Sequence, residues 1–105
     1  MYLPKPFKNF KENFSDIHQQ YEKLAKTCRE HGPLDQKSQD LVKLGIAIGQ
    51  NSKGGVMSLT RKALASGATA EEIHHAILLS LTTVGFPAMI AAMGWAEDVL
   101  EKQKD

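Results

Sequence analysis

The adjacent histidines His74 and His75 are the residues whose type and spacing first suggest chemistry. Neighbouring residues of a helix point about 100° apart, so the pair cannot chelate one metal ion as an HxxxH motif would. Glu71 and Glu72 each precede a histidine by three residues, but both Glu-x-x-His motifs fall in one helical turn, unlike those of a di-iron bundle. We therefore expect no metal and no cofactor. His75 is a candidate proton-transfer group facing a pocket; the alternative is a solvated or hydrogen-bonded histidine near a helix start.

A break rich in small polar residues, running from Gln50 to Gly55, is the second candidate for chemistry. Backbone N–H groups at a helix start attract anions, so Ser52 is a candidate ligand contact; the alternative is ordinary turn chemistry.

Composition excludes several classes of protein. Thirteen Lys and Arg against twelve Asp and Glu give a net charge of +1, which disfavours a nucleic-acid partner. The single cysteine, Cys28, excludes an intrachain disulfide, a CxxC pair and a multi-cysteine zinc site. The most apolar window, residues 84–96, is too short to span a bilayer, so no membrane partner is expected. We expect one cytoplasmic domain covering residues 1–105.

The hydrophobic pattern predicts helices and no strands. After an extended arm at residues 1–6, apolar residues alternate at steps of three and four from Phe7 to Cys28, which predicts one amphipathic helix with a narrow seam. Four further helices are expected: 36–50 with Asp35 as N-cap, 55–66 closed by Gly67, 70–83 opened by a Thr69–Glu72 capping box, and 88–102 after Pro87. The fold class is therefore all-α, a bundle of about five helices.

Apolar residues nearly encircle the expected helix at 70–83. So small a chain cannot cover such a helix on all sides, so we infer contacts between subunits and a homo-oligomer. The small residues after Pro87 would permit another helix to approach closely.

Three segments, LDQKSQDLVKLGIAIGQ, RKALASGATAEEIHHAILLSLTTVGFPA and AMGWAEDVL, resemble the carboxymuconolactone decarboxylase / alkylhydroperoxidase AhpD-like family. The resemblance covers the stretch from Leu34 to Leu100. It implies an all-helical fold that assembles as trimers or hexamers.

The peroxidase branch of that family has a glutamate, a CxxC pair and a histidine, which the resemblance places at Asp40, at Ser52 and Gly55, and at Leu59. Only the carboxylate survives, in shortened form, and serine and glycine cannot replace a dithiol, so AhpD-type peroxidase activity is not expected. The resemblance also places Arg61 where the family's helix often has an arginine, which makes it a candidate ligand contact; ordinary surface charge is the alternative.

Two functions stay open. One is an enzyme that performs acid–base chemistry on a small organic acid or related metabolite, with Asp40 and His75 transferring protons and Ser52 and Arg61 binding the ligand. The other is a non-catalytic oligomer with a degenerate peroxiredoxin-like site that binds a small molecule or a partner protein. In both, the ligand site is expected where the helices at 36–50 and 55–66 meet. His75 would be contributed by the helix at 70–83 or by a neighbouring subunit.

Overall fold

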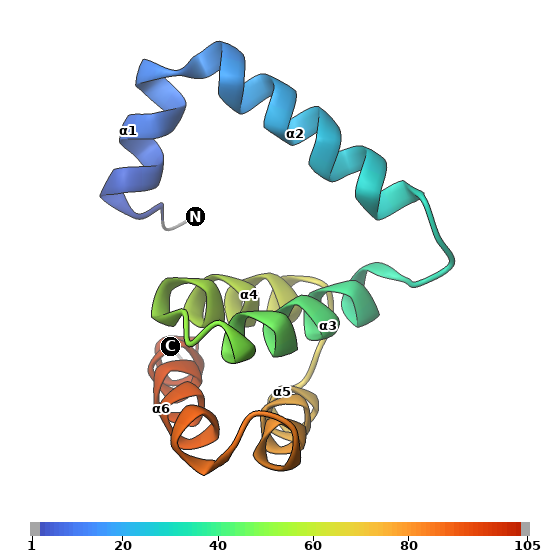
Figure 1. The fold of residues 1–105 in the computed structure, drawn as a ribbon, viewed down its shortest axis with the longest axis vertical. Helices are drawn as coiled ribbons and strands as arrows, with labels where there is room; N and C mark the ends of the chain where they lie inside the picture. Colours follow the sequence, from blue (N-terminus) through green and yellow to red (C-terminus); the bar gives the residue numbers. More distant parts are fainter. Residues whose placement is uncertain (1–2, 104–105) are drawn as a thin grey trace. The chain divides into compact units, whose positions relative to one another are not determined.

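A computed structural model describes residues 3–103, and these form helices and no strand, which confirms the all-α prediction (Figure 1). The elements are α1 (Lys5–Asn13), α2 (Ser15–Glu30), α3 (Gln36–Gly49), α4 (Lys53–Ala65), α5 (Ala70–Leu79), the 3-10 turn η1 (Ser80–Thr82) and α6 (Phe86–Lys102). The chain packs as two compact units that divide between Pro33 and Leu34. One unit holds α1 and α2, and the other holds α3 to α6. The single domain over 1–105 stays a prediction.

The prediction of one helix from Phe7 to Cys28 is wrong, because the backbone leaves helical geometry at Phe14, with φ −132° and ψ 51°. The break lets α1 fold against α2. Phe10 stacks on Phe14 with ring centroids 5.8 Å apart, and Phe7 meets His18 edge-on at 5.7 Å. These aromatic contacts compensate for the interrupted helix.

The extended arm is also shorter than predicted, since α1 begins at Lys5 with Pro4 as N-cap and Pro6 in its first turn. First-turn N–H groups have no partner within the helix, so proline costs little there. The first two residues of the arm lie outside the described residues.

Short-range caps fix the ends of α3, α4 and α5. The Asp35 carboxylate accepts the Ser38 N–H at 2.8 Å, and both halves of the Thr69–Glu72 capping box are present. Ser52 caps α4 and accepts the Gly55 N–H at 3.0 Å, so this helix begins two residues earlier than predicted. Gly67 adopts φ +96°, the left-handed conformation predicted for it.

The connection between α5 and α6 differs from the predicted continuous helix over 70–83. The α-helix ends at Leu79, and η1 follows because the Ser80 carbonyl accepts the N–H groups of Thr83, Val84 and Gly85 at 3.2, 2.7 and 3.1 Å. Gly85 has φ +122°, and α6 therefore begins at Phe86 rather than at residue 88.

The core of the α3–α6 unit takes one row of side chains from each helix. α3 packs on α4 and α5, and α4 packs on α6. The fully buried large side chains are Leu44, Ile48, Val56, Thr60, Ile73, Ile77 and Val99. Ala92 and Ala96 of α6 are completely buried, in keeping with the close helix approach predicted for this segment.

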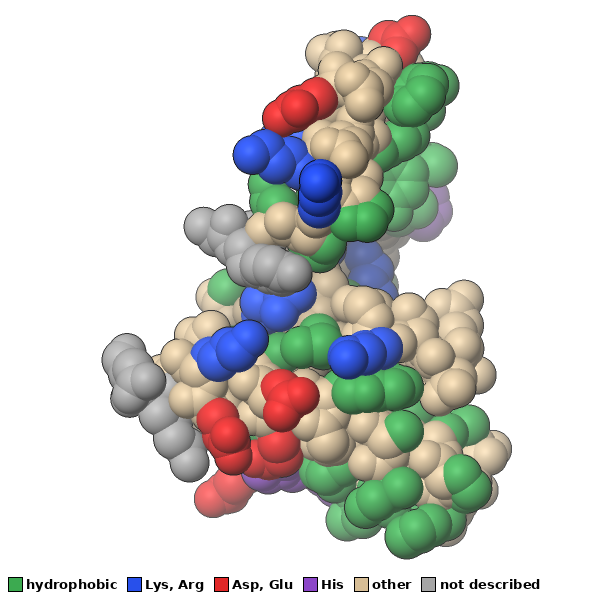
Figure 2. All heavy atoms as spheres, turned by 90° about the vertical axis from the view of Figure 1, so that its left-hand side faces the viewer, with side chains coloured by type: hydrophobic (Ala, Val, Ile, Leu, Met, Phe, Trp, Pro, Cys, Tyr) green, Lys and Arg blue, Asp and Glu red, His purple; other side chains and the backbone are tan. Residues whose placement is uncertain are grey.

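Much apolar surface remains outside this core. Only Ile73 and Ile77 of α5 are buried, while apolar side chains around the α5–α6 connection stay 38–59% exposed: Leu78, Leu79, Leu81, Val84, Phe86 and Ile90. Figure 2 shows apolar side chains gathered at the surface of the α3–α6 unit. Within residues 3–103, none of the helices combines the length and the apolar character that crossing a membrane would need.

Two leucines that differ in burial should differ in their contribution to the free energy of unfolding. Replacing the fully buried Leu44 by alanine should lower the free energy of unfolding by roughly 2–5 kcal/mol, since it leaves a cavity against α4 and α5. The matched Leu34→Ala change, at a side chain 54% exposed, should cost less than about 0.5 kcal/mol. Urea unfolding followed by circular dichroism measures both, and equal losses would contradict this description of the core.

Candidate functional site

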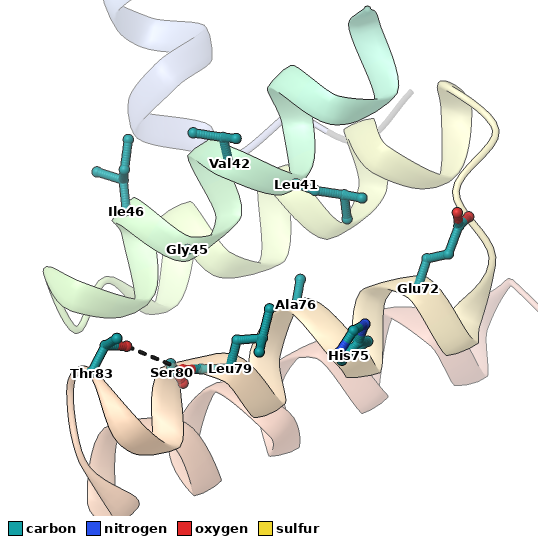
Figure 3. A pocket seen from close by; sticks show the side chains of 10 residues that line it. All are labelled: Leu41, Val42, Gly45, Ile46, Glu72, His75, Ala76, Leu79, Ser80 and Thr83. Carbon is teal, nitrogen blue, oxygen red and sulfur yellow. Dashed lines mark hydrogen bonds between the residues drawn. The ribbon is translucent and has the colours of Figure 1, made fainter. Parts of the chain in front are cut away.

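A groove of about 610 Å³ runs between α3 and α5 within the α3–α6 unit (Figure 3). Its walls are mostly apolar and its polar groups stand at the two ends. The lining residues are Leu41, Val42, Gly45, Ile46, Glu72, His75, Ala76, Leu79, Ser80 and Thr83. In Figure 3, Leu41 points toward α5, while Ala76 and Leu79 point toward α3. The volume is within the range of small-molecule sites, roughly 300–1,000 Å³.

The two adjacent histidines have different neighbours. His75 is exposed and lines the groove, whereas His74 pairs with Glu97 of α6. This divergence follows from the rotation between consecutive helical residues. Among residues 3–103, no cluster of three or more His, Cys, Asp or Glu side chains is placed to hold a metal ion. His75 is thus the imidazole available to a molecule in the groove.

Glu72, at the end of the groove beside His75, forms an ion pair with Lys37. Lys37 Nζ of α3 lies 3.0 Å from Glu72 Oε2 of α5, and Glu72 Oε1 accepts the backbone N–H of Thr69 at 2.9 Å. The Thr69 N–H and then the Lys37 ammonium stabilise the ionised carboxylate and lower the pKa of Glu72. One side chain therefore caps α5, links it to α3 and places negative charge at the groove.

The opposite end of the groove carries two hydroxyl groups that already donate to the backbone. Ser80 Oγ donates to the Ile77 carbonyl at 2.6 Å, and Thr83 Oγ1 donates to the Leu79 carbonyl at 3.2 Å. Their remaining capacity is to accept hydrogen bonds. A ligand group that donates would suit this end.

Asp40 is buried, with 2% of its surface exposed, but it does not line the groove. Its two carboxylate oxygens accept hydrogen bonds from Gln36 Nε2 at 3.1 Å and from Ser66 Oγ at 2.6 Å. Ser66 follows the last residue of α4, so Asp40 fastens α3 to the end of α4. In this structure the carboxylate performs a packing role.

Ser52 lies at the far end of α3 from Asp40. Gly49 comes nine positions after Asp40, which is about 14 Å along a helix that rises 1.5 Å per residue. The Ser52 hydroxyl is engaged in capping α4, which is the turn chemistry weighed against an anion site. Arg61 is half-buried on α4 and is not among the residues of the groove. Of the four predicted site residues, the groove brings in His75 alone.

The three positions at which the resemblance predicted the family's reactive groups, Ser52, Gly55 and Leu59, hold residues of the α4 cap and the core. A Cβ added to Gly55 would lie 2.8 Å from Ser52 Oγ and 3.2 Å from Ser52 Cβ. A side chain at position 55 would therefore crowd the Ser52 hydroxyl that caps α4. Leu59 packs against the core. Neither a thiol nor an imidazole stands at these three positions.

Sequence reasoning missed the α3 wall of the groove, formed by Leu41, Val42, Gly45 and Ile46, and missed Lys37. The sequence did hold a signal for this wall. The apolar band of α3 is wider than the single row of side chains that faces the core, so part of the band had to line another surface. The partner of that band is set by tertiary packing on α5. Lys37 and Glu72 are 35 residues apart, and no local pattern predicts their pairing.

A family model and one solved structure are similar to this chain. The model of the carboxymuconolactone decarboxylase family matches residues 15–98, from the start of α2 into α6. This extends further toward the N-terminus than the resemblance seen from Leu34. A crystal structure of a carboxymuconolactone decarboxylase family protein from Legionella pneumophila, in its apo form, superposes with a TM-score of 0.78. It shares 20% identity and covers 90% of this chain and 84% of its own, a likeness that shows the fold. No curated protein matches the chain.

The lowered pKa of Glu72 predicts a pH-dependent contribution to stability. Because the folded-state pKa lies below the unfolded value of about 4.5, the contribution is complete above that value and is lost as the pH falls through the folded pKa. Glu72→Gln should therefore lose less stability than the parent on acidification below pH 4.5, measured by urea unfolding midpoints. Glu71→Gln removes the same charge from the same helical turn and should keep the parent's slope. Parallel curves for all three proteins would contradict the assignment.

Proposed function

The chain belongs to the carboxymuconolactone decarboxylase family, and from this premise we propose that it binds a small organic molecule in the groove between α3 and α5. The observation that carries the proposal is the groove itself, which combines apolar walls with His75 and Glu72 at one end. An apolar cleft with a few convergent polar groups is the usual form of a small-molecule site.

The proposed ligand has an apolar body and a polar group that meets His75. The walls supplied by Leu41, Ala76 and Leu79 would exclude water from the body of the ligand. Lys37 next to Glu72 adds a positive charge at the same end, which suits a small organic acid or related metabolite. The family and these groups together support this class.

Acid–base catalysis on such a molecule is the second candidate function. The supporting observation is that His75 lies at the groove beside the ionised Glu72, and an imidazole can both accept and donate a proton. Asp40, whose oxygens are held by Gln36 and Ser66, would act in this scheme by fixing α3 rather than by touching the ligand. Ser52, at the other end of α3, would hold the start of α4 through its cap.

Dithiol peroxidase chemistry has no support in this chain. A peroxide-reducing cycle needs one thiolate to attack the peroxide and a second thiol to resolve the product. Ser52, Gly55 and Leu59 stand at the corresponding positions, and Cys28 lies on α2, outside the α3–α6 unit.

The proposal includes a homo-oligomer, either a trimer or a hexamer. It also treats residues 1–105 as a single domain of the family. The support is the exposed apolar patch around the α5–α6 connection, formed by Leu78, Leu81, Val84, Phe86 and Ile90. The cytoplasmic location stays a prediction of the sequence.

Ligand binding should depend on His75 and not on its neighbour. In a thermal-shift screen of small aromatic and aliphatic carboxylic acids, a binding acid should raise the Tm of the parent and of His74→Ala, and should raise that of His75→Ala much less. Leu79→Glu, which puts a charge on the groove wall, should abolish the shift. An acid that stabilises all four proteins equally would place the site elsewhere.

Hydroperoxide reduction should be absent. Purified protein with cumene hydroperoxide and a dithiol reductant should consume peroxide no faster than the buffer, and Cys28→Ser should behave identically. Rapid turnover that persists in Cys28→Ser would show that another residue performs the chemistry.

A further inference from the structure

Gly45 lies well inside α3, where a glycine weakens a helix relative to alanine. Nothing in the packing of residues 3–103 requires a glycine there, since a Cβ added at Gly45 would have no neighbouring heavy atom within 4 Å. Its backbone conformation does not require one either, because the glycines with positive φ in this part of the chain are Gly67 and Gly85. A reason for the glycine therefore has to come from a molecule that approaches α3.

The open space at Gly45 is part of the groove between α3 and α5. Val42 and Ile46 line the groove on either side of Gly45 in the sequence, and their side chains are about half exposed. The missing side chain leaves a gap between them. At this gap a ligand can touch the helix backbone itself, which is a common use of glycine in binding sites.

Leu79 and Ser80 of α5 lie across the groove from Gly45. Lys37 pairs with Glu72, and in Figure 3 the residues of α3 and of α5 advance in the same direction from the Glu72 end. Two helical turns beyond this pair, α3 reaches Gly45 and α5 reaches Leu79 and Ser80. The gap in one wall thus faces an apolar side chain of the other wall.

A flat ring is the group that this part of the groove fits best. One missing side chain opens a shallow slot, so a planar ring can lie with its face on the backbone at Gly45 and its other face toward Leu79. A saturated ring is thicker and cannot make both contacts as closely. His75 stands about one helical turn, or roughly 5 Å, before Leu79, so a short linker places a carboxylate beside the imidazole.

We propose that Gly45 determines the specificity of the groove, by admitting organic acids with a flat aromatic ring in preference to acids with a thick or branched apolar body. This inference rests on the proposed function, and it names the shape of the ligand that the groove takes. The competing occupant of the space at Gly45 is another protein surface, and the stability of the protein without ligand distinguishes the two.

Gly45→Ala tests whether the space is empty in the free protein. Where nothing packs on Gly45, alanine favours the helix without a clash, and the Tm of the unliganded protein should rise by about 2–8 °C. Gly94→Ala is the matched control, because Gly94 lies inside α6, has an equally open Cβ position and does not line the groove. Its Tm should rise by a similar amount. A lower Tm for Gly45→Ala alone would show that a protein surface packs there and would overturn the inference.

Phenylacetate and cyclohexylacetate test the selection, since they share the linker and the carboxylate and differ in the saturation of the ring. Unselective apolar binding would favour the saturated ring, which has the larger apolar surface. The parent and Gly94→Ala should instead bind phenylacetate more tightly, and Gly45→Ala should lose part of this preference. Gly45→Leu fills the gap and should weaken phenylacetate binding roughly tenfold or more, measured by titration calorimetry.

The binding results separate failure of this inference from failure of the proposed function. The inference alone fails if the parent prefers cyclohexylacetate, if Gly45→Leu binds phenylacetate as tightly as the parent does, or if other carboxylic acids bind the groove and phenylacetate does not. If no carboxylic acid binds the parent, the proposed function fails and this inference fails with it.

Discussion

A unit of four short helices can bury only one row of side chains from each helix, and this limit shapes the rest of the molecule. Leu44 and Ile48 of α3 and Ile73 and Ile77 of α5 fill the centre against α4 and α6. The other apolar side chains of the same helices have no place inside. They become the walls of the groove and the patch at the α5–α6 connection, so the possible functions of the surface follow from the size of the core.

Local signals in the sequence predicted several helix ends of the α3–α6 unit. Asp35, Thr69 and Gly67 act on backbone groups within a few residues, so their roles as caps could be predicted without knowledge of tertiary structure. The break at Phe14 could not, because the apolar repeat continues across it. What favours the break is the gathering of aromatic rings around His18, which exists only once α1 has folded back.

The candidate site shows the same division between local and tertiary information. The burial of Asp40 could be expected from its place beside the apolar band of α3, but its partner Ser66 is 26 residues away and turns a candidate acid into a fastening between helices. His75 could be separated from His74 by helical geometry alone. Which of them would face a cavity depended on the packing of α5 between α3 and α6, which places Glu97 beside His74.

The polar end of the groove separates it from the other exposed apolar surfaces. A patch without polar groups, such as that around Leu78, Phe86 and Ile90, is best covered by another protein surface, which removes apolar area from water and requires no specific partner atom. The groove has His75, Glu72 and Lys37 at its end, and burying these under a purely apolar subunit face would cost the loss of their hydration. A ligand with both an apolar body and a polar group can pack against the apolar walls and interact with the polar side chains at the end of the groove. The apolar side chains that do not fit in the core therefore favour two kinds of binding. The patch at the α5–α6 connection favours association of subunits, and the groove, which has charged groups at its end, favours binding of a small molecule.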